Sequence, residues 1–126
     1  MKDEKMISKL FDLEGRNIVI TGASGLLGSQ YANTLSSAGA NIILLDIDTA
    51  KNEKLKSTLI KKYKNKISAY TLDISNQTEV NKTSKKIMKD FKKIDGLINN
   101  AAYTSKGAKE KSDNAFGSFE NFPIDI

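Results

Sequence analysis

The sequence predicts an α/β protein with a three-layer αβα architecture and a doubly wound parallel sheet. Two patterns indicate this fold: short apolar segments alternate with longer amphipathic ones, and a glycine-rich turn follows the first apolar segment. Such alternation builds a parallel sheet, because each helix forms the crossover between two strands. With the glycine turn after the first strand, we expect the strand order 3-2-1-4, which is a partial form of the doubly wound fold.

The composition excludes several kinds of chemistry. The chain has 126 residues, which fits one domain, and it contains neither cysteine nor histidine. Disulfides, thiol catalysis, histidine general bases and the common zinc sites are therefore excluded. The net charge of +5 comes from lysines and a single arginine, Arg16. Because the lysines spread over two expected helices, we expect a solvated surface and no nucleic-acid partner; a basic nucleic-acid binder is a less favoured alternative.

The hydropathy of the chain predicts no membrane partner. The first 15 residues contain acids and lack a long apolar core, so they do not resemble a signal peptide. No apolar run approaches the roughly 20 residues that a membrane-spanning helix needs. We therefore expect a soluble, cytoplasmic protein.

The first strand and the turn after it carry the strongest local signal. Asn17–Thr21 is apolar and β-branched, which predicts a strand buried on both faces, and helical periodicity begins at Leu26. Gly22, Gly25 and Gly28 lie in this turn, where missing side chains let a ligand approach the main chain. The dipole and free amides of the new helix favour a phosphate group, although a tight packing turn is the alternative. A P-loop is excluded, because no GK[ST] follows.

The segments next to the first strand are expected to cover its flanks. The lead-in over residues 1–15 should cover one edge of the core with four apolar side chains: Ile7, Leu10, Phe11 and Leu13. The helix after the turn should end at Gly39. Its buried stripe should consist of residues at helical spacing, namely Leu27, Tyr31, Thr34, Leu35 and Ala38.

The remaining segments follow the same alternation. Further strands are expected at Asn41–Asp46, Ile67–Leu72 and Ile94–Asn99. The helix before the third strand is capped by Asp48 or Thr49, and its inner stripe is Leu55, Leu59 and Tyr63. The helix after it begins at Ser75 or Asn76, the latter with Glu79 in a capping-box pattern. Its inner stripe is Val80, Ser84, Ile87 and Phe91.

Polar residues follow every expected strand, where a doubly wound sheet binds its ligand. Asp46 lies about 20 residues past the glycine turn, where an acid accepts hydrogen bonds from a ribose 2′-hydroxyl and repels a 2′-phosphate. Ile47 supplies no cation, so NAD is favoured over NADP. The alternatives are that Asp46 only ends a strand or caps a helix, and that Asp48 has the ribose role.

The third and fourth strands end in further candidates. Asp73 could accept a hydrogen bond from the adenine amino group while Ile74 covers the ring; the alternative is an ordinary acid at a helix N-terminus. Asn99 and Asn100 can bond to neighbouring strand ends, and Ala101 lets a cofactor pass close by. Ordinary turn chemistry is the alternative for the two asparagines.

Taken together, these motifs resemble the N-terminal half of a short-chain dehydrogenase/reductase, from about Leu13 to Ala102. The motifs are TGASGLLG over residues 21–28, Asp46, Asp73-Ile74 and the NNAA run over residues 99–102. The resemblance implies a Rossmann-type fold and hydride transfer between a nicotinamide cofactor and an alcohol or carbonyl substrate. It also implies a homo-oligomeric full-length form. The cofactor-binding residues that it implies are Gly22, Ser24, Gly25, Leu26, Leu27, Gly28, Asp46, Ile47, Asp73, Ile74, Asn99 and Ala101.

The sequence departs from the family pattern in three ways. The glycine spacing TGxxGxxG is closer to the extended members, whereas the Asn-Asn-Ala run is similar to that of the shorter members. Ala102 stands where the family usually has glycine. The family's Tyr-x-x-x-Lys pair is absent, since the four tyrosines are followed four positions later by Leu35, Ile67, Ile74 and Gly107.

The missing catalytic pair decides the expected domain organisation. Residues 1–102 form the dinucleotide-binding unit, and residues 103–126 form a polar tail that leads into a missing second half. The sequence is therefore expected to be partial and inactive by itself. A non-catalytic nucleotide-binding or interaction module is the alternative function.

Overall fold

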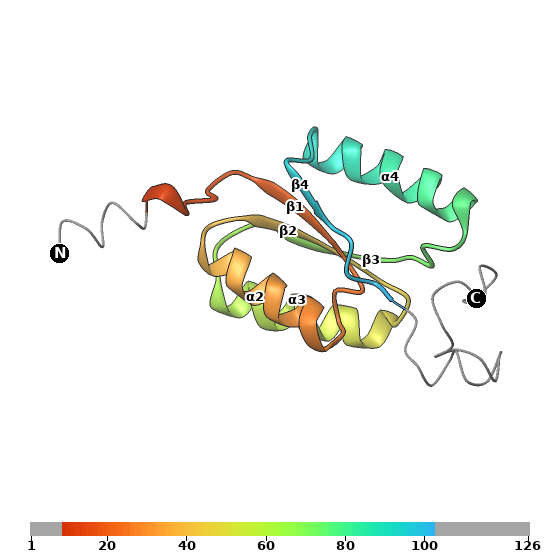
Figure 1. Cartoon of the computed structure of the whole chain (residues 1–126), viewed down its shortest axis with the longest axis horizontal. Coiled ribbons are helices and arrows are strands. Elements are labelled where there is room, and N and C mark those ends of the chain that lie inside the picture. The colour runs from red at the N-terminus through yellow and green to blue at the C-terminus, as the bar shows by residue number, and fades with distance from the viewer. Residues whose placement is uncertain (1–8, 103–126) are drawn as a thin grey trace, which may run out of the picture.

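The computed structural model describes residues 9–102 and shows four parallel strands in one sheet. The sheet has the order β3-β2-β1-β4, with α2 and α3 on one face and α4 on the other (Figure 1). The predicted fold class and strand order are thus confirmed. The elements are β1 (Asn17–Thr21), α2 (Leu26–Ser37), β2 (Asn41–Asp46), α3 (Thr49–Lys62), β3 (Ile67–Thr71), α4 (Gln77–Phe91) and β4 (Gly96–Ile98).

Two strands differ from their predicted bounds. β3 ends one residue early, although the Leu72 amide still donates to the Asp46 carbonyl at 2.9 Å. β4 covers only Gly96–Ile98, the three residues that pair with β1, although the Asp95 amide before it still donates to the Asn17 carbonyl at 2.8 Å. The division of the chain at residue 102 stays a prediction, since residues 103–126 lie outside the described part.

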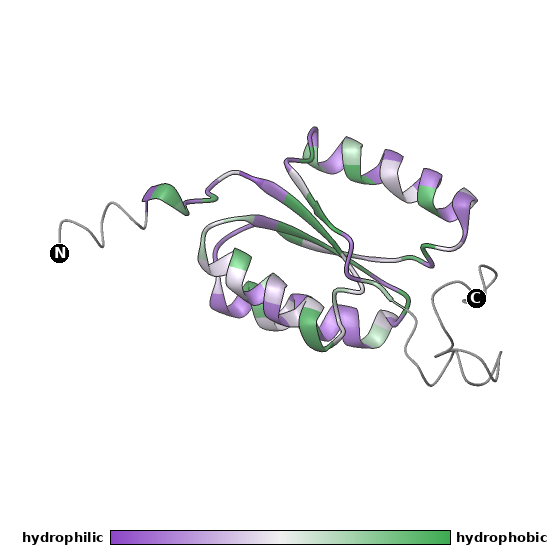
Figure 2. Ribbon diagram, viewed as in Figure 1, coloured by the Kyte–Doolittle hydropathy of each residue, from purple (hydrophilic) through white to green (hydrophobic). Residues whose placement is uncertain are grey.

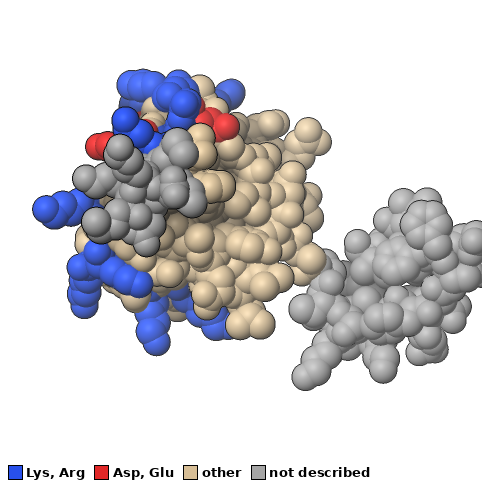
Figure 3. Space-filling model, turned by 60° about the vertical axis from the view of Figure 1, so that its left-hand side comes forward, with Lys and Arg blue, Asp and Glu red and all other residues tan. Residues whose placement is uncertain are grey.

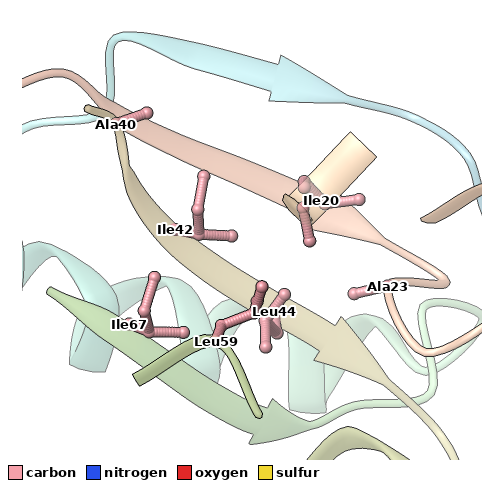
Figure 4. Close-up of a cluster of buried hydrophobic side chains, with 8 residues drawn as sticks. Ile20, Ala23, Ala40, Ile42, Leu44, Leu59 and Ile67 are labelled. Atoms are coloured by element: carbon pink, nitrogen blue, oxygen red, sulfur yellow. The ribbon is translucent and has the colours of Figure 1, made fainter. Parts of the chain in front are cut away.

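The sheet is buried on both faces, which explains the continuous apolar runs of β1 and β2. On the α2/α3 face the core contains residues such as Ile20, Ile42, Leu44 and Leu59 (Figure 4). On the α4 face, alternate residues of the same strands pack against Ile87 of the helix. Figure 2 shows the apolar strands enclosed between helices that carry both hydrophilic and hydrophobic residues.

The predicted buried stripe of α2 is wrong for its larger side chains. Leu27 is 57% exposed, Tyr31 is 38% exposed and Thr34 is also exposed. The helix instead buries its small residues, Gly28, Ala32 and Ser36, while Leu35 packs partly against the core. Gly28 lets the helix lie directly on the glycine turn, and this close approach turns the larger side chains outward.

The lead-in prediction is also wrong in part. Leu10 and Phe11 are 75% and 70% exposed, so they cover no edge of the core. Leu13 packs against the core as expected, and its amide donates to the Ala38 carbonyl. Ile7 lies outside the described residues.

Helix α3 largely follows its prediction, but it contains a buried polar residue that the periodicity did not reveal. Leu59 is buried, and Leu55 and Tyr63 pack against the core. Asn52 is 1% exposed, and its side-chain amide donates to main-chain carbonyls of β2 and β3 at 3.2 and 3.3 Å. Asp48 is the N-cap, because its side chain accepts from the Lys51 amide, and this bond holds the pKa of Asp48 below its ordinary value.

Helix α4 begins after Asn76, whose side chain accepts a hydrogen bond from the Glu79 amide. This confirms the predicted Asn76 cap. Ile87 and Phe91 are buried and Val80 is partly buried, but Ser84 is exposed and the partly buried position is Thr83. The predicted position of Ser84 in the buried stripe is therefore wrong by one residue. The helix has few apolar residues from which its buried face could be located.

Hydrogen bonds of asparagine and aspartate side chains connect the amino ends of the strands to neighbouring segments. The sequence did not indicate this role. The Asn17 side chain donates to the Phe91 and Lys93 carbonyls, and the Asn41 side chain donates to that of Asn17 at 2.9 Å. Asp95 accepts the main-chain amide of Asn17, also at 2.9 Å. These contacts hold the sheet at the end opposite to the candidate site.

Replacing Ser36 with alanine should stabilise the protein. Ser36 is 2% exposed, and its hydroxyl has no hydrogen-bond partner among residues 9–102. Since an unpartnered hydroxyl is costly and alanine favours a helix, we expect the free energy of unfolding to rise by about 1 kcal/mol in urea titrations. Ser37→Ala is the control, because that hydroxyl is exposed and already donates to the Thr34 carbonyl. A loss of stability in Ser36→Ala would contradict the assignment.

Asp95 should make the fold sensitive to acid. The Asn17 amide, followed by Lys93 and Arg16, holds the pKa of Asp95 below its ordinary value. A lowered folded-state pKa stabilises the protein above the unfolded-state pKa, and the effect disappears as the pH falls through the folded-state value. Asp95→Asn should therefore lose less stability than the wild type between about pH 7 and about pH 3.

Urea unfolding at the two pH values measures this difference. Asp12→Asn is the control, because Asp12 is in no ion pair among residues 9–102. Equal acid sensitivity of Asp95→Asn and the wild type would be inconsistent with the role of Asp95.

Candidate functional site

An open groove of about 920 Å³ lies at the carboxyl ends of the strands. Its lining contains most of the predicted site residues and brings them together from separate loops. Three of those residues, Ser24, Gly28 and Asn99, do not line it. The lining residues are Gly22, Gly25, Leu26, Leu27, Leu45, Asp46, Ile47, Leu72, Asp73, Ile74, Ser75, Asn100, Ala101 and Ala102.

Glycine is required where the first turn meets the last described loop. Gly22 has φ +60°, and a Cβ atom there would lie 2.9 Å from the Ala101 Cα atom. Residues that carry a side chain rarely adopt this backbone conformation. Gly22 thus lets the glycine turn touch the loop after β4, and the two segments together form one wall of the groove.

The N-terminus of α2 is open, in contrast to those of α3 and α4. Its N-cap is Gly25, which offers no side-chain acceptor, and its first turn contains no acid. The first hydrogen bond into the helix is from the Ser29 amide to the Gly25 carbonyl. The amides of Leu26, Leu27 and Gly28 therefore have no acceptor among the described residues. Together with the helix dipole they favour an anion beside the groove.

Asp46 connects the glycine turn to the start of α3. One carboxylate oxygen accepts the Ser24 amide and the other accepts the Asp48 amide, both at 2.9 Å. The sequence alternative that Asp46 caps α3 is not observed, because Asp48 is the N-cap. The two bonds fix a carboxylate at the edge of the groove, next to the exposed side chain of Ile47.

Asp73 and Ile74 line the groove beyond the end of β3. Asp73 accepts both the hydroxyl and the amide of Ser75, at 2.6 and 2.9 Å. These two bonds, the hydroxyl first, lower the pKa of Asp73. Ile74 is 50% exposed and Ile47 is 67% exposed, so the groove has apolar side chains beside its carboxylates. Together, these carboxylates and apolar side chains can bind a ring that carries polar groups.

Asn100 and Thr21 hold β1 and the loop after β4 together. The Asn100 side chain donates to the carbonyls of Thr21 and Gly22, each at 3.1 Å. The Thr21 hydroxyl accepts the amides of Asn100 and Ala101, at 3.0 and 3.1 Å. Asn99 is exposed, and within residues 9–102 the predicted bonding between strand ends is made by Asn100 and not by Asn99. Thr21 was missed, although a hydroxyl closing an apolar strand was a usable signal.

Two other features are absent from residues 9–102. No group of three or more acidic, cysteine or histidine side chains in this part is placed to hold a metal ion. No helix there has the length and apolar character to cross a membrane.

A family model described as short chain dehydrogenase matches residues 16–121. The chain belongs to this family. The predicted resemblance is therefore confirmed, and the match includes the whole β1–β4 region of this short-chain dehydrogenase.

Relatives of known name extend well beyond the length of this chain. A short chain dehydrogenases/reductase of Aspergillus versicolor is 32% identical over 105 residues, which cover 80% of this chain and 36% of that protein. An NADP-dependent mannitol dehydrogenase of Alternaria alternata is 30% identical over 102 residues, with 79% and 38% covered. The chain thus spans little more than a third of these relatives.

Solved structures of a dehydrogenase and a reductase also superpose on most of this chain, and they too are much longer than it. NAD+-bound xylitol dehydrogenase superposes with a TM-score of 0.69 at 33% identity, covering 72% of this chain and 35% of that one. The NADPH-dependent 3-quinuclidinone reductase of Rhodotorula rubra gives 0.72 at 26% identity, with 77% and 36% covered. One of these proteins holds NAD and the other depends on NADPH.

Proposed function

We propose that this chain forms the cofactor-binding half of an NAD-dependent oxidoreductase that acts on an alcohol or carbonyl substrate. The observation that carries the proposal is the pairing of an uncapped helix N-terminus with a fixed carboxylate, Asp46, on one groove. Amides attract a phosphate group, and a carboxylate accepts hydrogen bonds from sugar hydroxyls. A dinucleotide needs both groups, whereas a packing turn needs neither.

Different residues of the groove would bind different parts of the dinucleotide. The amides of Leu26 and Leu27, which line the groove, would hold the diphosphate, and Asp46 would accept the adenosine ribose hydroxyls. The bound nicotinamide would supply or take the hydride. The protein's part is to hold the cofactor against the strand ends and to shield one side of it from water.

The adenine end of the groove supports the same assignment. The side chains of Ile47 and Ile74 offer apolar contact to a ring, and the Asp73 carboxylate can accept its amino group. Ala101 packs on Gly22 and lines the groove, and its small side chain would let the cofactor pass close by. These roles are part of the proposal.

The choice of NAD over NADP rests on charge. A 2′-phosphate would face the Asp46 carboxylate, and Ile47 next to it supplies no cation. The first basic residue of α3, Lys51, is 3.4 Å from Asp48 and is thus engaged with an acid. Calorimetric titration of the chain with NADH and with NADPH tests this choice. We expect NADH to bind at least about 10-fold more tightly; equal affinity, or a preference for NADPH, would contradict it.

The remaining parts of the proposal concern the whole protein. The sequence contains no Tyr-x-x-x-Lys pair, so proton transfer to the substrate would depend on residues outside this chain. The substrate class, the homo-oligomeric full-length form and the cytoplasmic location stay predictions.

A further inference from the structure

Helix α4 carries a lysine face that the cofactor site does not use. We define this face by five exposed residues: Lys82, Lys85, Lys86 and Lys89 of the helix, and Lys92, its C-cap. Figure 3 shows basic side chains gathered at the top of the molecule, where α4 lies in Figure 1. The apolar side of the helix, with Ile87 and Phe91, is buried against the sheet. The lysines therefore point to solvent.

Within the described residues, no carboxylate lies within ion-pair distance of the five lysines. The two acids of α4 are engaged elsewhere. Asp90 accepts the Tyr70 hydroxyl at 2.8 Å, and Glu79 accepts the Asn76 side chain and the Asp73 amide. Helix α3 differs, because Lys51 and Lys56 each lie 3.4 Å from an acid three residues earlier.

The positive charges of the lysine face therefore repel one another. Lysines three and four residues apart on a helix destabilise it, and the face contains several such pairs. Lys92 adds backbone strain, since it is the one non-glycine residue with positive φ, at +67°, in the described part of the chain. An anionic partner would relieve the repulsion, and an outlier of this kind is a reason to look for a function.

We propose that the lysine face of α4 attaches the protein to an anionic lipid surface. Clusters of four to eight basic residues on a helix bind acidic headgroups, with about 1 kcal/mol for each lysine. The five lysines are exposed, while the buried residues of α4 pack on the sheet, so a flat surface can approach the helix from its lysine side. The expectation of no membrane partner rested on the lack of a spanning segment, and peripheral attachment needs none.

Nucleic acid fits this face less well. Single-strand binding combines a basic groove with exposed aromatic rings. Here the lysines lie on a convex helix, while the groove at the strand ends is lined by Asp46 and Asp73. The aromatic ring next to the face, that of Tyr70, lies beneath Lys86 and its hydroxyl is bonded to Asp90. In the described part of the chain, this face thus presents no free ring on which a base could stack.

Vesicle sedimentation with the full chain tests the proposal. We expect binding to vesicles that contain phosphatidylserine, none to pure phosphatidylcholine, and a steep loss as salt is raised. The triple variant Lys82→Gln, Lys85→Gln and Lys89→Gln should bind about 100-fold more weakly. The charge-matched control replaces Lys54, Lys61 and Lys64, on and just after α3, with glutamine and should keep most of the binding. Thermal unfolding should show the α4 variant to be at least as stable as the wild type.

Several outcomes would overturn the proposal. These are no binding to acidic vesicles, equal binding to neutral ones, or an equal loss in the α3 control. A labelled single-stranded DNA bound through the same lysines, with no vesicle binding, would assign the face to nucleic acid instead. Cofactor binding is read separately, so failure here leaves the proposed function untouched.

Discussion

Gly28→Ala is expected to destabilise the protein by at least about 2 kcal/mol, with the opposite sign from the usual effect of this substitution in a helix. A Cβ atom at residue 28 would lie 2.2 Å from the Gly22 carbonyl oxygen and 2.8 Å from the Ala23 Cα atom. Both are main-chain atoms, so neither can move aside like the end of a flexible side chain. The helix would have to shift away from the turn and from the core.

Urea unfolding of Gly28→Ala measures this effect, and Gln30→Ala is the matched control on the same helix. Gln30 is exposed, so its replacement should change the free energy of unfolding by less than about 0.5 kcal/mol. The shift in α2 should also weaken NADH binding, because the open amides belong to its first turn. If Gly28→Ala were as stable as Gln30→Ala, the close contact of α2 with the glycine turn would be wrong.

Asp46→Asn is expected to reduce both stability and cofactor selectivity. The carboxylate accepts one main-chain amide on each oxygen, from Ser24 and from Asp48. An asparagine side chain can accept only one of them, and its NH2 group would oppose the other. The unsatisfied amide should cost about 1–3 kcal/mol. Loss of the negative charge should bring the affinities for NADPH and NADH closer together.

The two effects are measured separately, by urea unfolding without cofactor and by calorimetry with each dinucleotide. Glu53→Gln is the control, because it removes a charge from α3 without touching the groove. A variant that unfolds like the wild type would argue against the two amide bonds. One that keeps the wild-type preference for NADH would argue against Asp46 as the selecting residue.

Much of the fold could be predicted because the strands carry their own signal. The run Ile42–Leu45 is fully apolar, and the structure buries it on both faces of the sheet. The exposure of Leu27 and Tyr31 could not be predicted. Their spacing is that of a buried stripe, whereas the contact of Gly28 with the turn, which rotates the helix, is a tertiary effect.

The positions of the site residues were more predictable than their contacts. Asp46 could be placed at a strand end from the sequence, but its bonds to two segments depend on how the sheet folds. Asn99 and Asn100 are alike in sequence. Since side chains alternate in direction along an extended chain, only the structure shows that Asn100 reaches β1.

The central claim is that a nicotinamide dinucleotide binds in the groove at the carboxyl ends of the strands. Amide NMR spectra of the chain, recorded while NADH is added, test it most directly. We predict that the largest and saturable shifts occur at the amides of Leu26, Leu27 and Gly28 and at Asp46. Shifts confined to other parts of the chain, or no shift as NADH is raised, would contradict the account.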